Sequence, residues 1–378
     1  AEWHAWMAGI VHEMAPDLPC HAKVMPLAWG QSSILGGTDP WEFAKFSQFN
    51  GNDCYFLPHN NSAPWESSWQ VQNMYYDLQR SMKRVPVFNT ENHIISDREQ
   101  RYVSPNHIYT AIWQGAIHGQ AGSATWTWER TYDAKSDFEG LILHRPACTA
   151  AMSRCALDLM RLSREVSALQ NLEPRVAILF SNAAMVHDPR ASDMRSRVYE
   201  ALNFCGIPVG FVTDEQVAAG WLDKYDCLIV GGARNVLSGA LDAIRAYQKA
   251  GHFVLECGGD NMKEDEYKRS VEPVAANESI DASLAGEPLR DALTAALAKA
   301  GIAPDVTLKT PDGRVPFGVE WRSVPYEGGV VMNLVNLTRQ PITVSLPTGQ
   351  WVDLISTKPC ESNFTLEPNT PVLISRKG

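Results

Sequence analysis

The sequence lacks the features that assign a chain to a membrane or to nucleic acid. No apolar run reaches the roughly 20 residues that a membrane-spanning helix needs. No cluster of Lys and Arg interrupts a formal net charge of −10, which disfavours nucleic acid and membrane surfaces as partners. The opening segment, AEWHAWMAGIVHEM, has no cationic region and therefore does not resemble a signal peptide. We expect a cytoplasmic protein.

The sequence also lacks the patterns by which metals and dinucleotides are usually held. None of its eight cysteines forms a CxxC pair, and most lie inside apolar runs such as DCLIV and FVLEC. This predicts buried free thiols in a reducing compartment and disfavours a structural zinc site. GxGxxG is absent, so a dinucleotide role is unsupported. We expect no metal and no organic cofactor.

Aromatic residues and histidines are present, but unevenly distributed. The chain has 378 residues, 45% of them hydrophobic, which is enough for two or three domains with cores. Nine of the twelve Trp and eight of the ten His precede residue 150. Indole faces and imidazoles suit a polar, ring-shaped ligand, although a single Trp often only fills a core. We therefore expect the functional site in the first 150 residues.

Residues 1–170 alternate between helical and strand patterns. Apolar residues recur at helical spacing over 3–14, and Ser104-Pro105 is a typical helix start. Such alternation predicts parallel strands joined by helices, as in a (β/α)8-type barrel. We expect strands at 21–25, 54–57, 85–89 and 121–128, and helices at 3–14, 66–83, from 105 onward and at 146–170.

Two further domains follow. Residues 171–303 contain buried-type strands such as RVAILFS alternating with helices, which predicts an open, doubly wound α/β domain; 260–286 are expected to be loop. Residues 304–378 have alternating strands, with a hairpin signal at Glu327-Gly328-Gly329. They predict a small antiparallel β-sandwich. The fold class is therefore α/β with a C-terminal β domain.

The segment PVFNTENH is the most informative for function. A β-type run ends in a carboxylate, Glu91, flanked by Asn89 and His93. Active sites of parallel barrels lie at the C-terminal ends of the strands. We predict Glu91 as a catalytic carboxylate with Asn89 and His93 beside it. The alternative is that Glu91 is a helix-start or loop carboxylate.

Two other predicted strand ends carry polar or aromatic side chains. SATWTWE places Trp126 and Trp128 on one strand face, where one of them could form the floor of a sugar site. Glu129 could be a second carboxylate, or it could pair with Arg130. LPHNN places His59 at the end of the second strand, as a partner of the substrate or of a carboxylate, or as an isolated loop histidine.

PVFNTENH, followed about 30 residues later by GSATWTWE, resembles the seventh and eighth strands of retaining glycoside hydrolase barrels, the group that includes β-galactosidases and β-glucosidases. The order of a flavodoxin-like domain and a small β-sandwich resembles the family 42 β-galactosidases. The resemblance implies that Glu91 is the nucleophile and that Trp126 lines the subsite of the cleaved sugar. It also implies a carbohydrate substrate, contacted by His59, Asn89 and His93.

The chain departs from this family in one respect. The family places its acid/base in an Asn-Glu pair at the end of strand four, and no such strand is present here. Eight βα units take about 250 residues, whereas about 150 precede the second domain. The sequence thus resembles the C-terminal half of a barrel, with Glu129 as a possible substitute. Because open sheet edges promote association, we expect a homo-oligomer or another chain to cover them.

Two other functions stay open. The first is an esterase-type hydrolase in the half-barrel cleft; Gly122-Ser123-Ala124 is a partial match to GxSxG, and Cys257-Gly258-Gly259 is similar to a nucleophile elbow. The second is a non-catalytic module for sugar binding or assembly. All three hypotheses use a carbohydrate or small-molecule ligand.

Overall fold

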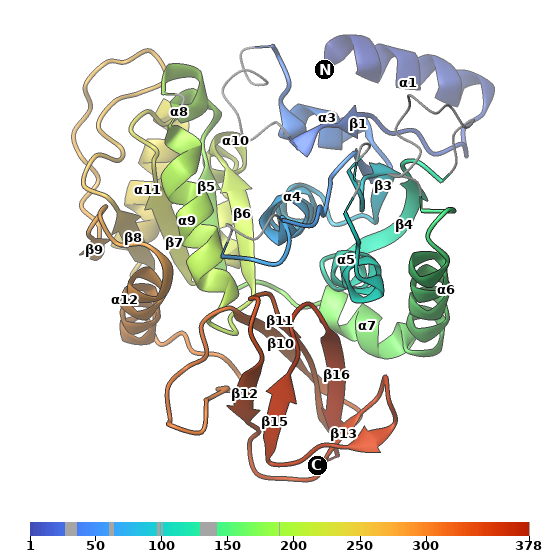
Figure 1. The fold of residues 1–378 in the computed structure, drawn as a ribbon. Helices are drawn as coiled ribbons and strands as arrows, with labels where there is room; N and C mark the ends of the chain where they lie inside the picture. Colours follow the sequence, from blue (N-terminus) through green and yellow to red (C-terminus); the bar gives the residue numbers. More distant parts are fainter. Residues whose placement is uncertain are drawn as a thin grey trace. The chain divides into compact units, whose positions relative to one another are not determined.

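The computed structural model describes residues 1–26, 36–59, 64–96, 99, 101–128, 142–188 and 190–377. Within these ranges the fold is mixed α/β, with an open four-stranded sheet, a doubly wound parallel sheet and a C-terminal antiparallel β domain (Figure 1). This confirms the predicted fold class. None of the sheets in the described ranges closes into a barrel.

The first sheet has the strand order of half a βα barrel. Its order is β1-β2-β3-β4, so strands consecutive in sequence are also neighbours, and β3 pairs with β4 in parallel. The strands are β1 (Lys23–Val24), β2 (Asn50–Asn52), β3 (Val87–Asn92) and β4 (Gln120–Thr125). The helices of this region are α1 (Glu2–Met14), α3 (Pro40–Phe46), α4 (Trp69–Met82), α5 (Pro105–Ile117), α6 (Pro146–Arg161) and α7 (Ser163–Gln170).

The second strand lies earlier than its sequence predicts. NGND has turn composition, yet Asn50–Asn52 is β2, whereas the segment expected as a strand, 54–57, has only an isolated bridge from Tyr55 to His93. Tertiary contacts explain the difference. The Asn50 amide donates to Gln79 O at 3.1 Å and to Lys83 O at 2.9 Å. A Cβ at Gly51 would lie 1.9 Å from Nδ1 of His21, so only glycine fits there.

Helix boundaries follow their capping residues. Ser104 Oγ accepts a hydrogen bond from Asn106 N at 3.3 Å, and α5 begins at Pro105 as predicted. The helix predicted over 146–170 is instead two helices, because Leu162 leaves helical geometry between α6 and α7.

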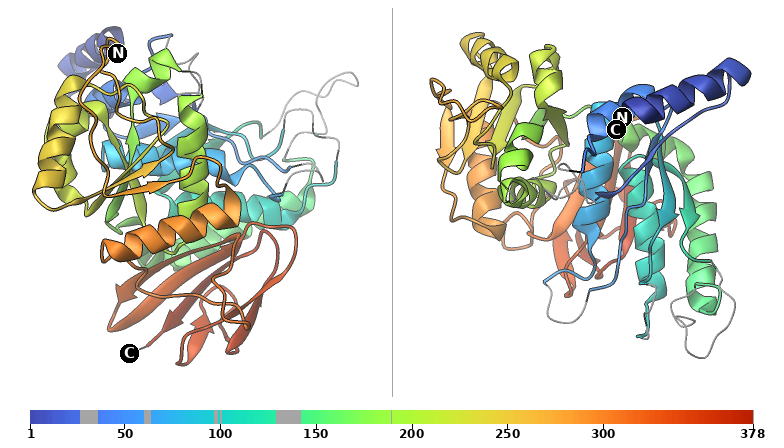
Figure 2. Two further views of the ribbon diagram at one scale, coloured as in Figure 1. Left: turned by 90° about the vertical axis from the view of Figure 1, so that its left-hand side faces the viewer. Right: turned by 90° about the horizontal axis from the view of Figure 1, so that it is seen from above.

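The doubly wound sheet has the order β6-β5-β7-β8-β9, with every neighbouring pair parallel. Helices α9 and α12 cover one face and α11 the other (Figure 2), so the strands are continuous apolar runs. β9 lies in a segment predicted as loop. The strands are β5 (Val176–Phe180), β6 (Val209–Thr213), β7 (Cys227–Gly231), β8 (Phe253–Cys257) and β9 (Glu278–Ile280). The helices are α8 (Asn182–His187), α9 (Ala191–Asn203), α10 (Asp214–Ala218), α11 (Ser238–Lys249) and α12 (Gly286–Lys299), with a 3-10 turn at Trp221–Lys224.

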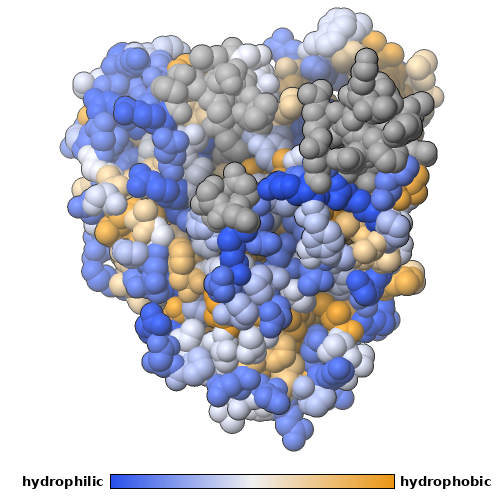
Figure 3. Space-filling view, viewed as in Figure 1, coloured by the Kyte–Doolittle hydropathy of each residue, from blue (hydrophilic) through white to orange (hydrophobic). Residues whose placement is uncertain are grey.

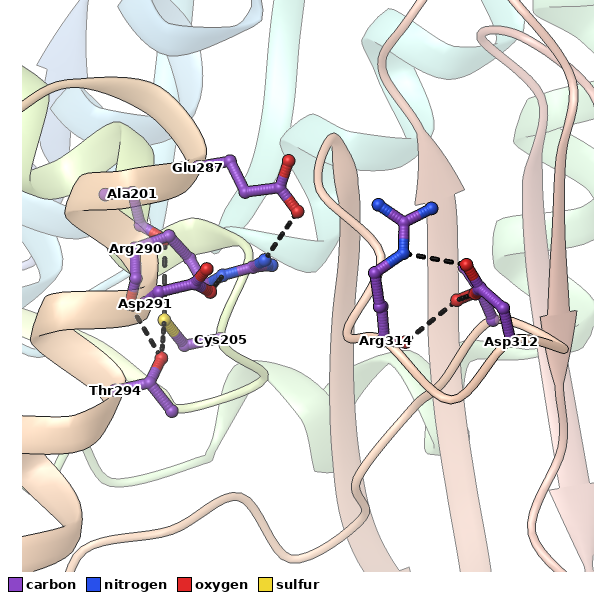
Figure 4. A network of polar contacts seen from close by, with 9 residues as sticks. Ala201, Cys205, Glu287, Arg290, Asp291, Thr294, Asp312 and Arg314 are labelled. Carbon is purple, nitrogen blue, oxygen red and sulfur yellow. Dashed lines mark hydrogen bonds and ion pairs between the residues drawn. The ribbon is translucent and has the colours of Figure 1, made fainter.

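A buried arginine stabilises α12 (Figure 4). Arg290 is 2% exposed, and its guanidinium contacts Asp291 at 2.6 Å and Glu287 at 3.2 Å. Cys205 Sγ lies 3.2 Å from Thr294 Oγ1, and burial raises the pKa of this thiol to about 11. All eight cysteines are free and six are buried, as the sequence predicts.

The C-terminal domain contains the predicted hairpin. β10 (Val319–Tyr326) and β11 (Gly329–Asn336) pair with Tyr326 opposite Gly329. Glu327 and Gly328 both have positive φ, 46° and 77°, as a two-residue type I′ turn requires. The strand orders are β10-β11-β16-β13-β14 and β12-β15. The remaining strands are β12 (Ile342–Ser345), β13 (Trp351–Asp353), β14 (Lys358–Pro359), β15 (Asn363–Leu366) and β16 (Pro371–Arg376).

Two compact units divide the chain. One contains residues 1–51, 77–85 and 173–304; the other contains 52–76, 86–172 and 305–378. The second unit holds most of the segments predicted to bear the site. The domain boundaries 1–170, 171–303 and 304–378 stay a prediction.

Candidate active site

A bulge in β3 brings Glu91 onto the exposed side of the strand. A regular strand alternates its side chains between two faces. Here the buried residues are Val87, Asn89 and Asn92, whereas Phe88, Thr90, Glu91 and His93 are partly exposed. The pairing register between β3 and β4 shifts between Asn89 and Asn92. The extra residue explains how Thr90 and Glu91 can be adjacent and both partly exposed.

Glu91 and His93 form a pair at this end of β3. His93 Nε2 lies 3.4 Å from Glu91 Oε1, and both side chains are 23% exposed. The His93 ring lies 5.8 Å from the Trp126 ring, with the planes 41° apart. Trp126 N donates to Asn92 O at 3.0 Å, which holds the indole beside β3. The structure therefore brings together three predicted site residues, Glu91, His93 and Trp126.

β4 ends before the two tryptophans. The strand predicted over 121–128 stops at Thr125, so Trp126 and Trp128 lie in the turn that follows. They are 37% and 42% exposed, and the Trp126–Thr127 peptide bond is cis. The predicted strand is therefore too long: neither tryptophan belongs to β4, so strand alternation does not decide their faces. Glu129, the predicted second carboxylate, lies outside the described residues.

Asn89 is a buried residue whose side chain contacts the backbone of Glu91. Its side chain is fully buried, and Nδ2 donates to Cys54 O at 2.8 Å and to the Tyr76 hydroxyl at 2.9 Å. Its Oδ1 accepts from Glu91 N at 3.2 Å. The substrate contact predicted for Asn89 stays a prediction, and its polar atoms are bonded within the protein.

His59 lies in the segment after β2. Its backbone N donates to Glu66 O at 3.1 Å, and burial lowers the pKa of its half-buried ring. Because β2 ends at Asn52, His59 does not lie directly at the strand end, where the sequence predicts it, and its role towards Glu91 stays a prediction.

Sequence reasoning missed His107, on the buried face of α5. Its Nε2 lies 3.0 Å from Phe56 O and 2.9 Å from Ile94 O, two carbonyls of the segments after β2 and β3. Burial lowers the pKa of His107 to about 4, so the ring is neutral at pH 7 and Nε2–H donates to these carbonyls. The sequence signal was a histidine between apolar residues of a helix, a pattern that most often marks core.

This arrangement suits covalent chemistry on a sugar. A partly exposed carboxylate can attack an electrophilic carbon, and an exposed indole offers a flat apolar face to a ring. In the described part of the chain, no three His, Cys, Asp or Glu side chains are grouped to hold a metal ion. None of the described helices has the length and hydropathy of a membrane span.

The fold is similar to part of the architecture of solved GH42 glycoside hydrolases, as the sequence predicts. The first comparison is with an apo exo-carrageenase GH42 from Bacteroides ovatus, with a TM-score of 0.85 and 22% identity over 100% of this chain and 54% of that chain. Gan42B, a GH42 β-galactosidase from G. stearothermophilus, has a TM-score of 0.75 and 14% sequence identity, covering 97% of this chain and 65% of that chain. A β-galactosidase from Rahnella sp. R3 has a TM-score of 0.74 and 17% sequence identity, covering 99% of this chain and 66% of that chain.

The chain thus spans between about half and two thirds of the length of these structures. At such identities the likeness concerns the fold. No protein-family model and no curated protein sequence matches the chain.

Proposed function

We propose that this chain is part of a glycoside hydrolase that cleaves β-galactosides or related sugars with retention of configuration. Glu91 is its nucleophile. The observation that supports this is the partly exposed Glu91 carboxylate at the C-terminal end of a parallel strand, in a fold shared with GH42 β-galactosidases. Catalytic side chains of parallel barrels lie at that end.

The proposed reaction has two steps. Glu91 attacks the anomeric carbon, the bond to the leaving oxygen breaks, and a glycosyl-enzyme forms. A second carboxyl group protonates the leaving oxygen and then deprotonates the water that releases the sugar. Retaining enzymes hold the two groups about 5–5.5 Å apart. Glu129, or a carboxylate outside this four-stranded half, fills this role.

The other predicted residues hold the sugar and the nucleophile. His93, 3.4 Å from Glu91, orients the carboxylate, and the exposed Trp126 ring lies under the sugar. His59 contacts the substrate from the segment after β2. We place the protein in the cytoplasm, where free thiols stay reduced.

An oligomer completes the proposed site. Three of the six residues of β4, Ala121, Ser123 and Ala124, are exposed, and an exposed strand at a sheet edge favours pairing with another polypeptide. We propose that a second copy, or another chain, covers the open edges. Light scattering of the purified chain tests this, and a monomer at micromolar concentration contradicts it.

Covalent labelling tests the nucleophile. A 2-deoxy-2-fluoro-β-galactoside with a dinitrophenyl leaving group needs no general acid, so it reacts even where the second carboxylate is absent. We expect one adduct, located at Glu91 by peptide mass spectrometry. Glu91→Gln should abolish labelling, whereas Glu66→Gln should not, because Glu66 pairs with Arg339 at 3.0 Å instead.

Three results contradict the proposal: no adduct, an adduct elsewhere, or labelling of Glu91→Gln. Hydrolysis of nitrophenyl acetate that survives Glu91→Gln favours the esterase alternative. Cys257 is a poor nucleophile for it, because burial raises the pKa of that thiol to about 12. Galactose binding without an adduct favours the non-catalytic module. Carrageenan oligosaccharides belong in the substrate panel because of the exo-carrageenase neighbour.

A further inference from the structure

We propose that Asn89 is a positioning residue whose side chain builds the bulge that places Glu91 on the exposed side of β3. The inference rests on the proposed role of Glu91 as nucleophile. It adds a residue that acts on the carboxylate through the backbone.

Asn89 forms a hydrogen bond with the Glu91 backbone. Asn89 Oδ1 accepts from Glu91 N at 3.2 Å, which closes an Asx turn two residues long. A backbone N–H bonded to a side chain is withdrawn from regular strand pairing. The register between β3 and β4 shifts at this position, between Asn89 and Asn92. The turn and the bulge therefore coincide.

The hydrogen-bond partners of the Asn89 amide fix its orientation. Nδ2 has two hydrogens, and two acceptors lie within reach, Cys54 O at 2.8 Å and the Tyr76 hydroxyl oxygen at 2.9 Å. The Tyr76 hydroxyl hydrogen is donated to Gln120 Oε1 at 2.7 Å, so its oxygen can accept from Asn89. This chain of donors leaves Oδ1 pointing at Glu91 N, and the flipped amide would lose all three bonds.

Burial keeps this arrangement in place. Asn89, Cys54 and Tyr76 are fully buried, and Gln120 is 8% exposed. Burial raises the pKa of Tyr76 well above its usual value, so the hydroxyl stays a donor. A buried polar group that loses its partners is costly, so the amide has no cheap alternative conformation. The buried Asn89 amide thereby fixes the position of the Glu91 backbone N–H.

The consequence is geometric. Without the bulge, alternation would return Glu91 to the buried side of β3, the side of Asn89. Loss of the Asn89 amide should therefore misplace the carboxylate, and a displacement of about 1 Å costs roughly 100-fold in rate. The effect should fall on the rate of attack and spare the affinity for the sugar.

The test compares Asn89→Ala with Asn50→Ala in the full chain. Asn50 is also a buried asparagine in the same sheet that donates to two carbonyls, of Gln79 and Lys83, so it controls for general destabilisation. The probe is the dinitrophenyl 2-fluorogalactoside. We expect Asn89→Ala to label about 100-fold more slowly with an inhibition constant within about threefold of native. Asn50→Ala should label at close to the native rate.

Two further variants keep the test decisive if Asn89→Ala does not fold. Asn89→Ser retains an oxygen that can accept from Glu91 N and should recover part of the rate, because serine forms the same turn more weakly. Tyr76→Phe removes one acceptor of the Asn89 amide and keeps the shape of the core, so it should slow labelling severalfold.

Hydrogen exchange gives a readout that needs no activity. The Glu91 amide should exchange faster in Asn89→Ala than in native protein or Asn50→Ala. Equal labelling rates for the two alanine variants, or an unchanged Glu91 amide, overturn the positioning role. If native protein is not labelled, the proposed nucleophile fails, and the exchange of the Glu91 amide alone decides whether Asn89 holds this backbone.

Discussion

His118 Nε2 lies 2.9 Å from Glu320 Oε1, and neither side chain is accessible to solvent, at 0% and 1% exposure. Arg322 Nη2 lies 2.8 Å from the other ring nitrogen, Nδ1. Arginine cannot accept a hydrogen bond, so Nδ1 is unprotonated and His118 is neutral, with its hydrogen on Nε2. The neutral ring therefore accepts a hydrogen bond from Arg322 at Nδ1 and donates one to Glu320 from Nε2.

Glu320 is satisfied on both of its oxygens. Oε2 accepts from Gln114 Nε2 at 3.0 Å and from Asn73 Nδ2 at 3.3 Å, and Arg322 Nε lies 3.3 Å from Oε1. The carboxylate therefore connects α4, α5 and β10 within one compact unit. A buried charge with a complete set of partners stabilises a specific packing, and it becomes a liability when one partner is removed.

Glu320→Ala should lower the free energy of unfolding by about 3–5 kcal/mol, because it leaves buried donors and the Arg322 charge without their acceptor. Urea denaturation followed by circular dichroism measures the change. Asp312→Ala is the matched control, since Asp312 pairs with Arg314 at 2.7 Å where both side chains are more than half exposed (Figure 4). Equal losses for the two variants would show that burial of the Glu320 network contributes nothing specific.

His107 should make the protein sensitive to acid. Burial lowers its pKa from 6.5 to about 4, so the folded state favours the neutral ring. Its stabilisation is fully present above pH 6.5 and is lost as pH falls through 4, at most about 3 kcal/mol for this shift. His107→Gln keeps a donor for Phe56 O and does not titrate. Its unfolding free energy should fall less than that of native protein between pH 6.5 and 4.

The control for His107 is His4→Gln, on the exposed surface of α1, which should keep the native acid dependence. Five large apolar side chains of α1 are also solvent-exposed, Trp3, Trp6, Met7, Ile10 and Met14, whereas Ala8 is buried; apolar atoms are visible at the upper right of Figure 3. An acid profile of His107→Gln that overlays the native one would exclude His107 as the source of the loss.

Asp214 should make the free energy of unfolding fall as pH rises, the opposite of the effect of His107. Burial raises its pKa from 3.8 to about 8. Ser181 Oγ lies 2.7 Å from Asp214 Oδ2 and 2.8 Å from Asn235 O, and its single hydrogen can serve only one of them. A protonated Asp214 donates to Ser181, which then donates to Asn235 O. This contribution is fully present below pH 3.8 and is lost as pH rises through 8.

Asp214→Asn removes this titration and keeps a donor for Ser181. Relative to native protein, its unfolding free energy should rise with pH between 4 and 8, by up to the order of 5 kcal/mol. Urea titrations at several pH values measure the slope. The control Asp188→Asn, on a half-exposed side chain paired with Arg190, should leave the slope native. A parallel slope for Asp214→Asn would refute a protonated Asp214.

Local patterns predicted the elements whose surroundings agree with them. RVAILFS is apolar on both faces and forms the buried β5, and Glu327-Gly328 supplies the two positive φ angles of the hairpin. NGND failed because the partners of Asn50 are carbonyls about 30 residues away, which composition does not contain. Propensity is a weak guide where tertiary hydrogen bonds decide the conformation.

In the site, too, local patterns predicted some features, whereas features that depend on tertiary contacts were missed. A carboxylate at a strand end was visible in PVFNTENH, so Glu91 and His93 could be predicted as neighbours. The register shift in β3 was not visible, and neither were the partners of the buried Asn89 amide, because Cys54 O and the Tyr76 hydroxyl come from other segments of the chain. His107 was missed for a related reason: a histidine in an apolar helix has the same sequence pattern whether it is inert core or contacts two carbonyls, as His107 does.

A comparison of Trp126 with Trp128 distinguishes an indole that binds a sugar from an ordinary exposed aromatic residue. Both are exposed to a similar extent, and the Trp126 ring lies 5.8 Å from that of His93, which contacts Glu91. Trp126→Ala should weaken galactose binding about tenfold, roughly 1.4 kcal/mol, because the sugar loses an apolar face next to the nucleophile. Trp128→Ala should change it less than about twofold. Isothermal titration calorimetry on Glu91→Gln protein measures both without turnover. Equal losses would assign the two indoles a shared surface role, and a larger loss for Trp128→Ala would move the platform to that ring.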